Sequence, residues 1–186
     1  PTTLIYTLSP HDALPICVAI SGGSSVSAGT AALSLSGQSG TAVGVKISGT
    51  APPAPAAESS VSGGNVTIQG QTAATSGGAV SLDRGRVTGS GTVYIDASTG
   101  RSISIDANSH IVKNNDGDLS LVADQIDIQG TVGASATSGR VILRTLTPNR
   151  PIHLGAADTS TELGISDAEL DLITTPTIVI GKRDTT

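Results

Sequence analysis

The chain has 186 residues, a net charge of −5 and only 13% charged side chains. This composition excludes disorder driven by self-repulsion and argues against nucleic acid as a partner, because an acidic chain repels phosphate. Phe, Trp and Met are absent, two Tyr are the only aromatic residues, and Gly occurs 23 times. Such a composition is typical of many short strands and turns around a thin core of small branched side chains.

The opening segment, residues 1–17, differs from the rest of the chain. It contains "YTLSPHDALPI", which has neither the alternation nor the Gly and Ser turn chemistry found later. This stretch resembles the translated read-through of a sequencing adapter, with Pro10 in place of the usual leucine. We therefore expect residues 1–17 to be a non-native tail. Cys17, the only cysteine, cannot form an internal disulfide.

From residue 18 onward one pattern recurs: two apolar residues separated by a middle residue that is usually small or polar. The triplets begin at Val18, Leu33, Val45, Val66, Val80, Val93, Ile103, Leu119, Ile126 and Val141. Alternation with a period of two places both outer residues on one face of a strand. The pattern therefore predicts short, half-buried strands separated by turns.

Longer echoes connect these triplets. "ISG" recurs at Ile20 and Ile47, and "VTIQG" at Val66 is answered by "IDIQG" at Ile126. Self-similarity at this range indicates a solenoid, in which coils of roughly 20 to 30 residues stack their Val, Ile and Leu side chains into interior ladders. The predicted fold is all-β, a parallel β-helix. A β-sandwich also fits short strands with turn signals, but the absent aromatic core and the echoes favour the solenoid.

The chain after the tail divides into three parts. Residues 18–60 hold Gly- and Ser-rich strand repeats with a Pro-rich loop at 51–58, which cannot donate enough backbone hydrogen bonds to lie inside a sheet. Residues 61–147 hold the regular β-helix coils. Residues 148–186 form a strand-helix-strand unit.

The C-terminal unit contains the only predicted helix, in "ISDAELDLI". Ser166 and Glu169 have the spacing of a capping box, in which each side chain satisfies a free backbone N–H of the first turn. Ile165 and Leu170 can form a hydrophobic staple across the cap. We expect one short helix of about two turns, followed by a strand in "PTIVI".

Two groups of residues, the three histidines and an Asn- and Asp-rich stretch, are candidate sites that we interpret as structural. His11, His110 and His153 have no nucleophile motif near them, and His11 falls in the expected tail. The stretch "NNDGD", Asn114–Asp118, gathers oxygen ligands around a Gly, as calcium loops do. The further ligands of such a loop are missing, and a tight turn explains the same residues.

Asp167, Glu169 and Asp171 form the densest acidic cluster. Glycoside hydrolysis needs two carboxyl groups on opposite sides of a bond, whereas these lie on one short helix, where the cap and the helix dipole account for them. We therefore expect no catalytic, cofactor-binding or metal-binding residue in this segment. The alternative is a carbohydrate-active β-helix enzyme, of the polysaccharide lyase or pectinase kind, although Tyr94 is the only aromatic outside the tail that could stack on a sugar.

The segment "RPIHLGAADTSTELGISDAELDLITTPTIVIG", Arg150 to Gly181, resembles a unit of very large bacterial exoproteins of the filamentous haemagglutinin type. "GVKISG" at Gly44 and "GNVTIQG" at Gly64 look like the strands that precede that unit. The resemblance implies a right-handed β-helix that is secreted or displayed on the cell surface through an outer-membrane export pore. It further implies a structural or adhesive role, with neighbouring coils and a host or sister-cell receptor or glycan as partners.

Overall fold

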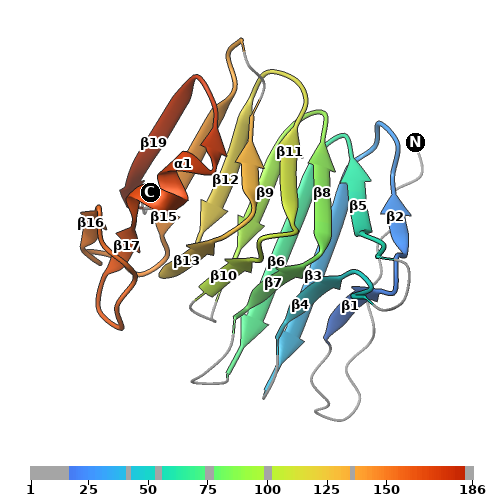
Figure 1. The fold of residues 1–186 in the computed structure, drawn as a ribbon, viewed down its shortest axis with the longest axis horizontal. Helices are drawn as coiled ribbons and strands as arrows, with labels where there is room; N and C mark the ends of the chain where they lie inside the picture. Colours follow the sequence, from blue (N-terminus) through green and yellow to red (C-terminus); the bar gives the residue numbers. More distant parts are fainter. Residues whose placement is uncertain are drawn as a thin grey trace.

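The computed structural model describes residues 17–40, 43–52, 56–73, 78–98, 102–134 and 137–182. The expected tail up to residue 16, with Tyr6 and His11, lies outside this description, and Cys17 is exposed with a free thiol. The chain is all-β apart from one short helix, and most of its strands lie in parallel sheets that run along the long axis, with successive strands side by side (Figure 1). Within the described ranges no helix is long and apolar enough to cross a membrane.

Three sheets, which we name A, B and C, contain most of the strands. Sheet A consists of β1 (Val18–Ser21), β4 (Val45–Ser48), β7 (Val80–Asp83), β10 (Ser102–Ile105) and β13 (Gln125–Ile128). Sheet B consists of β2 (Ser25–Ser27), β5 (Ser59–Gly63), β8 (Gly85–Gly89), β11 (His110–Lys113), β14 (Thr131–Gly133) and β18 (Ile173–Thr174). Sheet C consists of β3 (Leu33–Ser39), β6 (Val66–Thr72), β9 (Val93–Asp96), β12 (Asp118–Val122), β15 (Arg140–Thr145) and β19 (Thr177–Lys182).

The chain visits sheets A, B and C in turn, and we call one such passage a coil. Each coil adds one strand to each sheet, in parallel with the strand of the preceding coil. The parallel ladders rule out the antiparallel β-sandwich that the sequence left open. In sheet A, Val18, Val45, Val80, Ile103 and Ile126 are in register, so successive coils are 27, 35, 23 and 23 residues long. The longest coil contains the Pro-rich loop, whose ends meet in an antiparallel bridge between Thr50 and Ala57.

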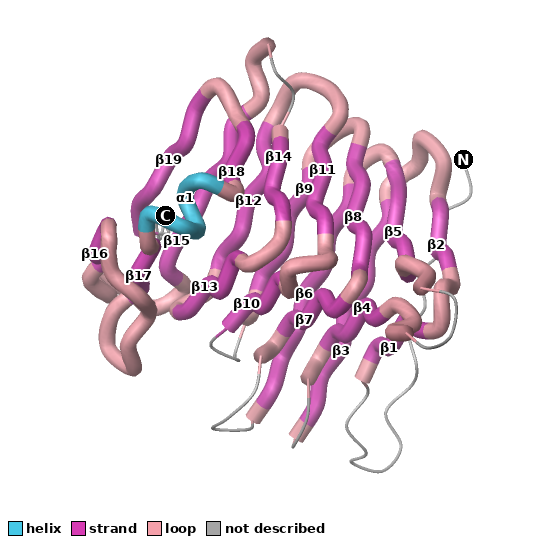
Figure 2. The backbone as a smooth tube through the Cα atoms, viewed as in Figure 1, coloured by secondary structure: helices cyan, strands magenta, loops and turns pink. Residues whose placement is uncertain are grey.

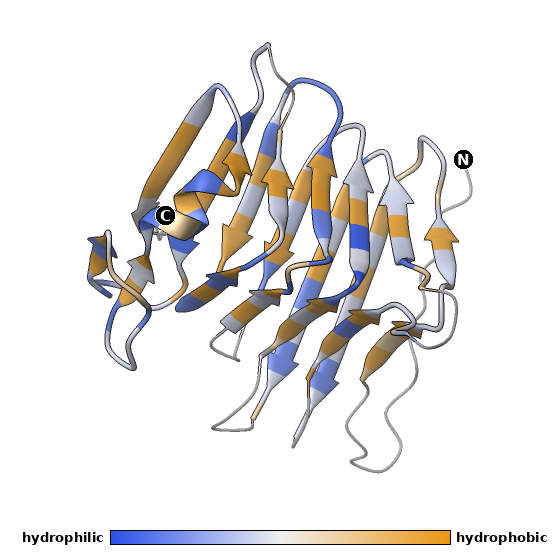
Figure 3. Cartoon of the chain, viewed as in Figure 1, coloured by the Kyte–Doolittle hydropathy of each residue, from blue (hydrophilic) through white to orange (hydrophobic). Residues whose placement is uncertain are grey.

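The core consists of aliphatic ladders that run from coil to coil. Sheets A and C each supply two ladders, because both outer residues of every triplet face inward, and sheet B supplies one. The sheet B ladder is Val26, Val61, Val87, Ile111, Val132 and Ile173. Apolar and polar bands alternate along the strands (Figure 3), and Ile47, Ile105 and Leu121 illustrate inward side chains with no exposed surface.

The C-terminal unit departs from the regular coil. Sheet A ends at β13. After β15, where a further strand of sheet A would follow, the chain instead forms a two-stranded parallel sheet of β16 (Ile152–Leu154) and β17 (Leu163–Ile165), then helix α1 (Asp167–Asp171). The predicted capping box is confirmed, since Ser166 caps α1 and exchanges hydrogen bonds with Glu169. The helix has five residues, fewer than expected, and the chain then rejoins sheets B and C through β18 and β19 (Figure 2).

All ten triplets are confirmed as parts of strands, and every one of them belongs to sheet A or sheet C. The sheet B strands carry no triplet and were not predicted. One echo is also out of phase: "VTIQG" begins β6 in sheet C, whereas "IDIQG" begins in β13 of sheet A. The "ISG" echo, by contrast, is structurally equivalent, because Ile20 and Ile47 are register partners.

Candidate functional site

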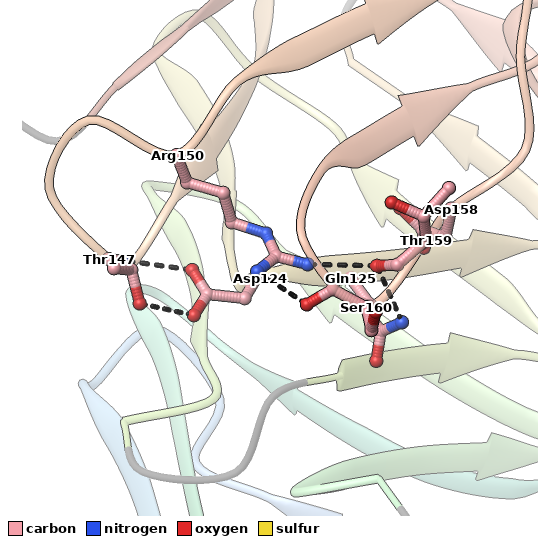
Figure 4. Close-up of a pocket in the computed structure, with 7 residues that line it drawn as sticks. All are labelled: Asp124, Gln125, Thr147, Arg150, Asp158, Thr159 and Ser160. Carbon is pink, nitrogen blue, oxygen red and sulfur yellow. Dashed lines mark hydrogen bonds between the residues drawn. The ribbon is translucent and has the colours of Figure 1, made fainter.

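A polar hollow lies where the regular coils meet the C-terminal unit (Figure 4). Its volume is about 480 Å³. Asp124 and Gln125 come from the β12–β13 junction, Thr147 and Arg150 from the segment after β15, and Asp158, Thr159 and Ser160 from the β16–β17 loop. We call it the Arg150 hollow.

Asp124 holds the turn that follows β15. One carboxylate oxygen accepts the N–H groups of Leu146 at 3.0 Å and Thr147 at 2.7 Å, and the other accepts the Thr147 hydroxyl. This side chain is buried, so its charge is satisfied by the turn rather than by solvent. Asn149 in the same turn has a φ of 62°, a left-handed conformation that Asn tolerates better than most residues.

Arg150 fastens the β16–β17 loop to the stack. Its guanidinium donates to the carbonyl oxygens of Thr159 at 3.0 Å, Ser160 at 3.2 Å and Glu162 at 3.2 Å. The remaining donor, Nε, is buried and has no hydrogen-bond partner in the part of the chain that the structure describes. The main charge-assisted bonds of Arg150 are therefore directed at backbone, as Figure 4 shows for Thr159 and Ser160.

Asp158 and Glu169 bind the free N–H groups of β13, the last strand of sheet A. Asp158 accepts the N–H of Ile126 at 2.8 Å, and Glu169 accepts the N–H of Ile128 at 3.1 Å. In a regular coil these N–H groups donate to a carbonyl of the next coil, as Val45 does to Ala79 at 3.0 Å. The two carboxylates thus replace the acceptors that a further sheet A strand would supply.

The electrostatics of Asp158 reflect this position. Asp158 also accepts the N–H of Gly164 at 2.8 Å. Desolvation by burial raises the pKa of Asp158 to about 6, helped by the nearby Glu169 charge and opposed by the two backbone N–H donors and by Arg150. Both oxygens of the carboxyl group are engaged by backbone, so a ligand in the Arg150 hollow would have to displace one of these bonds.

A second hollow lies at the corner between sheets A and B, with a volume of about 370 Å³. Its polar lining is Glu58, Arg84, Asn108 and His110. Glu58 pairs with Arg86 at 3.0 Å and with His110 at 3.3 Å, and the other ring nitrogen of His110 lies 2.7 Å from the Thr131 hydroxyl. We call this the Arg84 hollow.

The candidate residues of the sequence analysis lie apart from one another. His110 begins β11, and His153 lies exposed on β16, where it pairs with Glu162 at 3.1 Å. Glu169 serves the capping box and the sheet A edge, and Asp167 and Asp171 are exposed on α1. Among the described residues no group of three or more His, Cys, Asp and Glu could hold a metal ion.

In the "NNDGD" stretch, backbone carbonyl oxygens bind the ammonium group of Lys113. Lys113 faces inward at the end of β11, is 1% exposed, and its ammonium donates to the carbonyl oxygens of Asn115 and of Asp116, the latter at 2.7 Å. Desolvation lowers the pKa of Lys113, against the attraction of Asp116 and Asp118. The ammonium lies against the turn carbonyls that would face a cation in a calcium loop.

Sequence reasoning did not single out Asp124, Arg150, Asp158 or Arg84. Each lies outside the apolar triplets, in a turn or loop whose composition resembles the other turns of the chain. No local signal marks them, because their partners lie on other coils or in the C-terminal unit. No family model, no curated protein and no solved structure matches the chain.

Proposed function

We propose that the chain is a segment of a right-handed parallel β-helix that performs a structural or adhesive role in a secreted or surface-displayed exoprotein. The observation that carries this proposal is the continuity of the five aliphatic ladders, in which each coil buries its apolar residues mainly against the coils on either side. Scaffolds of this kind grow by adding coils and leave their outward faces free to vary. Catalysis is not part of the proposed role.

The proposed partners follow from the same architecture. Ile178 of β19 is in register with Val141, which has no exposed surface, yet Ile178 is 38% exposed because no described strand lies beyond β19. A neighbouring coil would bury it. The resemblance of the Arg150–Gly181 segment to filamentous haemagglutinin-type exoproteins supports the remaining partners: an outer-membrane export pore, and a receptor or glycan on a host or sister cell.

The location is tested with antibodies raised against the purified chain. They should label intact cells of the producing strain as strongly as permeabilised cells, and external protease should remove the signal. Labelling only after permeabilisation would contradict surface display.

For adhesion, beads coated with the folded chain should bind target cells more than beads coated with the heat-unfolded chain, and equal binding would contradict an adhesive role of the fold.

One observation favours a second candidate function, a carbohydrate-active enzyme. Asp124 and Asp158 line the same polar hollow, and the pKa of Asp158 is raised to about 6, which suits a general acid near neutral pH. Their engagement by backbone N–H groups argues for the structural role. Release of reducing sugar from a polysaccharide panel, abolished in Asp158→Asn and retained in Asp83→Asn, would establish the enzyme and overturn the non-catalytic proposal.

A further inference from the structure

The Arg84 hollow differs from the Arg150 hollow in how its arginine is used. The guanidinium of Arg150 is engaged by three carbonyl oxygens. Arg84 makes no side-chain hydrogen bond or ion pair with any residue in the described ranges. The volume of about 370 Å³ falls at the lower end of the range for small-molecule sites, about 300 to 1,000 Å³. The hollow can therefore accommodate one small ligand.

The backbone of Arg84 is held in an unfavourable conformation. Its φ is 55°, and among the described residues the only other non-glycine with a positive φ is Asn149. Asn is enriched in this region, whereas a long side chain is uncommon there. A glycine would adopt the same conformation without strain. Strain of this kind marks positions where the side chain has a use, so the inference runs from the outlier to a function.

The surroundings fix Arg84 on both sides. Its N–H donates to Asp106 at 2.9 Å, and its carbonyl accepts the N–H of Ser59 at 3.2 Å. Desolvation by burial alone would raise the pKa of Asp106, but hydrogen bonds from Ser109, the Arg84 backbone and Asn108 outweigh this effect and lower it. A Cβ atom on Gly49 would lie 2.8 Å from the Arg84 Cβ. It would also lie 2.1 Å from the Ala57 carbonyl oxygen, so Gly49 allows both Ala57 and Arg84 to approach it closely.

The charges around the hollow favour an anion. Among the described residues, Glu58, the acidic residue in its lining, is paired with Arg86 and His110. The Asp106 carboxylate beside the hollow is held by the Arg84 N–H, Ser109 and Asn108. The guanidinium of Arg84 is therefore the lining cation that has no ion pair with a described residue. A guanidinium presents a planar fork of donors that matches a carboxylate in two parallel hydrogen bonds. The acceptors of the lining, the Glu58 carboxylate and the Asn108 amide oxygen, suit hydroxyl donors.

We propose that the Arg84 hollow binds a carboxylate-bearing sugar, with Arg84 pairing with the carboxylate and with Asn108 and Glu58 accepting from ring hydroxyls. A hydroxyl-rich ring both donates and accepts hydrogen bonds, which fits a lining that combines free donors with acceptors. The inference gives a chemical class to the glycan partner of the proposed function. Its test does not depend on surface display, because binding is a property of the purified chain whether or not the chain is displayed on a cell.

The test is a titration of the ¹⁵N-labelled chain, followed by NMR, with glucuronate, acetate and glucose as three probes. One charge-assisted pair with a few hydroxyl contacts should give glucuronate a Kd of about 1 mM. Acetate should bind at least about tenfold more weakly because it lacks the hydroxyls, and glucose should not bind measurably. No binding of glucuronate, binding of glucose as tight as that of glucuronate, or equal binding of acetate and glucuronate would each overturn the proposal.

Two variants separate a ligand-binding arginine from a structural one. Arg84→Asn and Arg84→Gly should both weaken glucuronate binding at least about tenfold, the effect of losing one charge-assisted pair. Their thermal midpoints should be unchanged or higher, because the left-handed conformation suits both new residues. The control Arg140→Asn removes an exposed arginine that pairs with Asp118 on sheet C and should leave binding intact. Unchanged binding in the Arg84 variants, or lost binding with a lower midpoint, would overturn the proposal.

Discussion

Sheets A and C differ from sheet B in how they meet the core. In sheet A, Ile103 and Ile105 of β10 both face inward, whereas in sheet B Ile111 of β11 is the one inward aliphatic residue of its strand. Its inward neighbours are Ser109 and Lys113, both buried. A parallel stack can therefore bury a whole sheet with a single aliphatic ladder, provided that polar groups at the corners find partners.

The corners of sheet B show how those partners are supplied. Ser109 accepts the N–H of Gly85 at 3.0 Å and donates to Asp106 at 2.6 Å. Ser59 repeats the arrangement two coils earlier, accepting from Gly23 at 3.1 Å and donating to a carbonyl at 2.8 Å. Buried hydroxyls thus replace apolar side chains where the chain turns from sheet A into sheet B, and each bridges neighbouring turns of the stack.

The strongest test of the comparison removes one aliphatic side chain from each kind of sheet. Ile105→Ala in sheet A and Ile111→Ala in sheet B should each lower the free energy of unfolding by about 2 to 5 kcal/mol, because both side chains are fully buried. Urea denaturation measures both. Ile178→Ala, at the partly exposed end of a ladder, is the control and should cost less than about 1 kcal/mol. A much smaller cost at Ile111 would mean that sheet B is loosely packed.

A second test concerns the buried cation of sheet B. Lys113→Met keeps the length of the side chain but leaves the carbonyls of Asn115 and Asp116 without the ammonium. We expect a loss of about 2 kcal/mol, since unsatisfied buried acceptors are costly. Lys46→Met, at an exposed position on β4 of sheet A, is the matched control and should change little. Equal midpoints in urea for Lys113→Met and the parent would show that the turn holds without the lysine.

A smaller effect is expected at the hydroxyl of the sheet B corner. Ser109→Ala removes the acceptor of the Gly85 N–H and should lower the free energy of unfolding by about 1 to 2 kcal/mol. Ser104→Ala, on the outward face of β10 in sheet A, is the control, with a cost near zero. If amide hydrogen exchange at Gly85 were as slow in Ser109→Ala as in the parent, the hydroxyl would have no part in closing the corner.

The smallest effect concerns Asp158, whose side chain accepts an N–H group of β13, the last strand of sheet A. Because burial raises the pKa of Asp158 to about 6 from 3.8, the folded state binds a proton more tightly than the unfolded state. Stability should therefore be fully present below about pH 4 and fall as the pH rises to about 6. Solvent screening of this half-exposed group reduces the change to about 1 kcal/mol.

Urea midpoints at pH 4 and pH 7 measure this change in the parent and in Asp158→Asn, in which the dependence should flatten. Asp83→Asn, on the exposed end of β7, is the control and should keep the dependence of the parent. An unchanged pH dependence in Asp158→Asn would assign the titration to another group.

The local parts of the structure could be predicted from the sequence. Paired inward residues such as Val80 and Leu82 produce a period of two within three positions, which is why all the strands of sheets A and C up to β15 were found. The capping box of Ser166 and Glu169 was predicted for the same reason, since its partners are three residues apart. In β8, Val87 is the one aliphatic residue and lies between two glycines, so the segment shows no such period. The sequence of a sheet B strand therefore predicts a turn and not a strand.

The sequence by itself determined the strand faces, the helix cap and the stacked all-β class, because these depend on residues a few positions apart. Only the tertiary structure decided where charges and polar groups are used. Asp158 and Glu169 meet N–H groups 32 and 41 residues away, and Arg84 is fixed by Asp106 across 22 residues. Such pairs depend on the lengths of the intervening coils, which vary with each loop. A local sequence pattern does not show which residues of different coils lie side by side. The stacking of the aliphatic ladders sets that alignment.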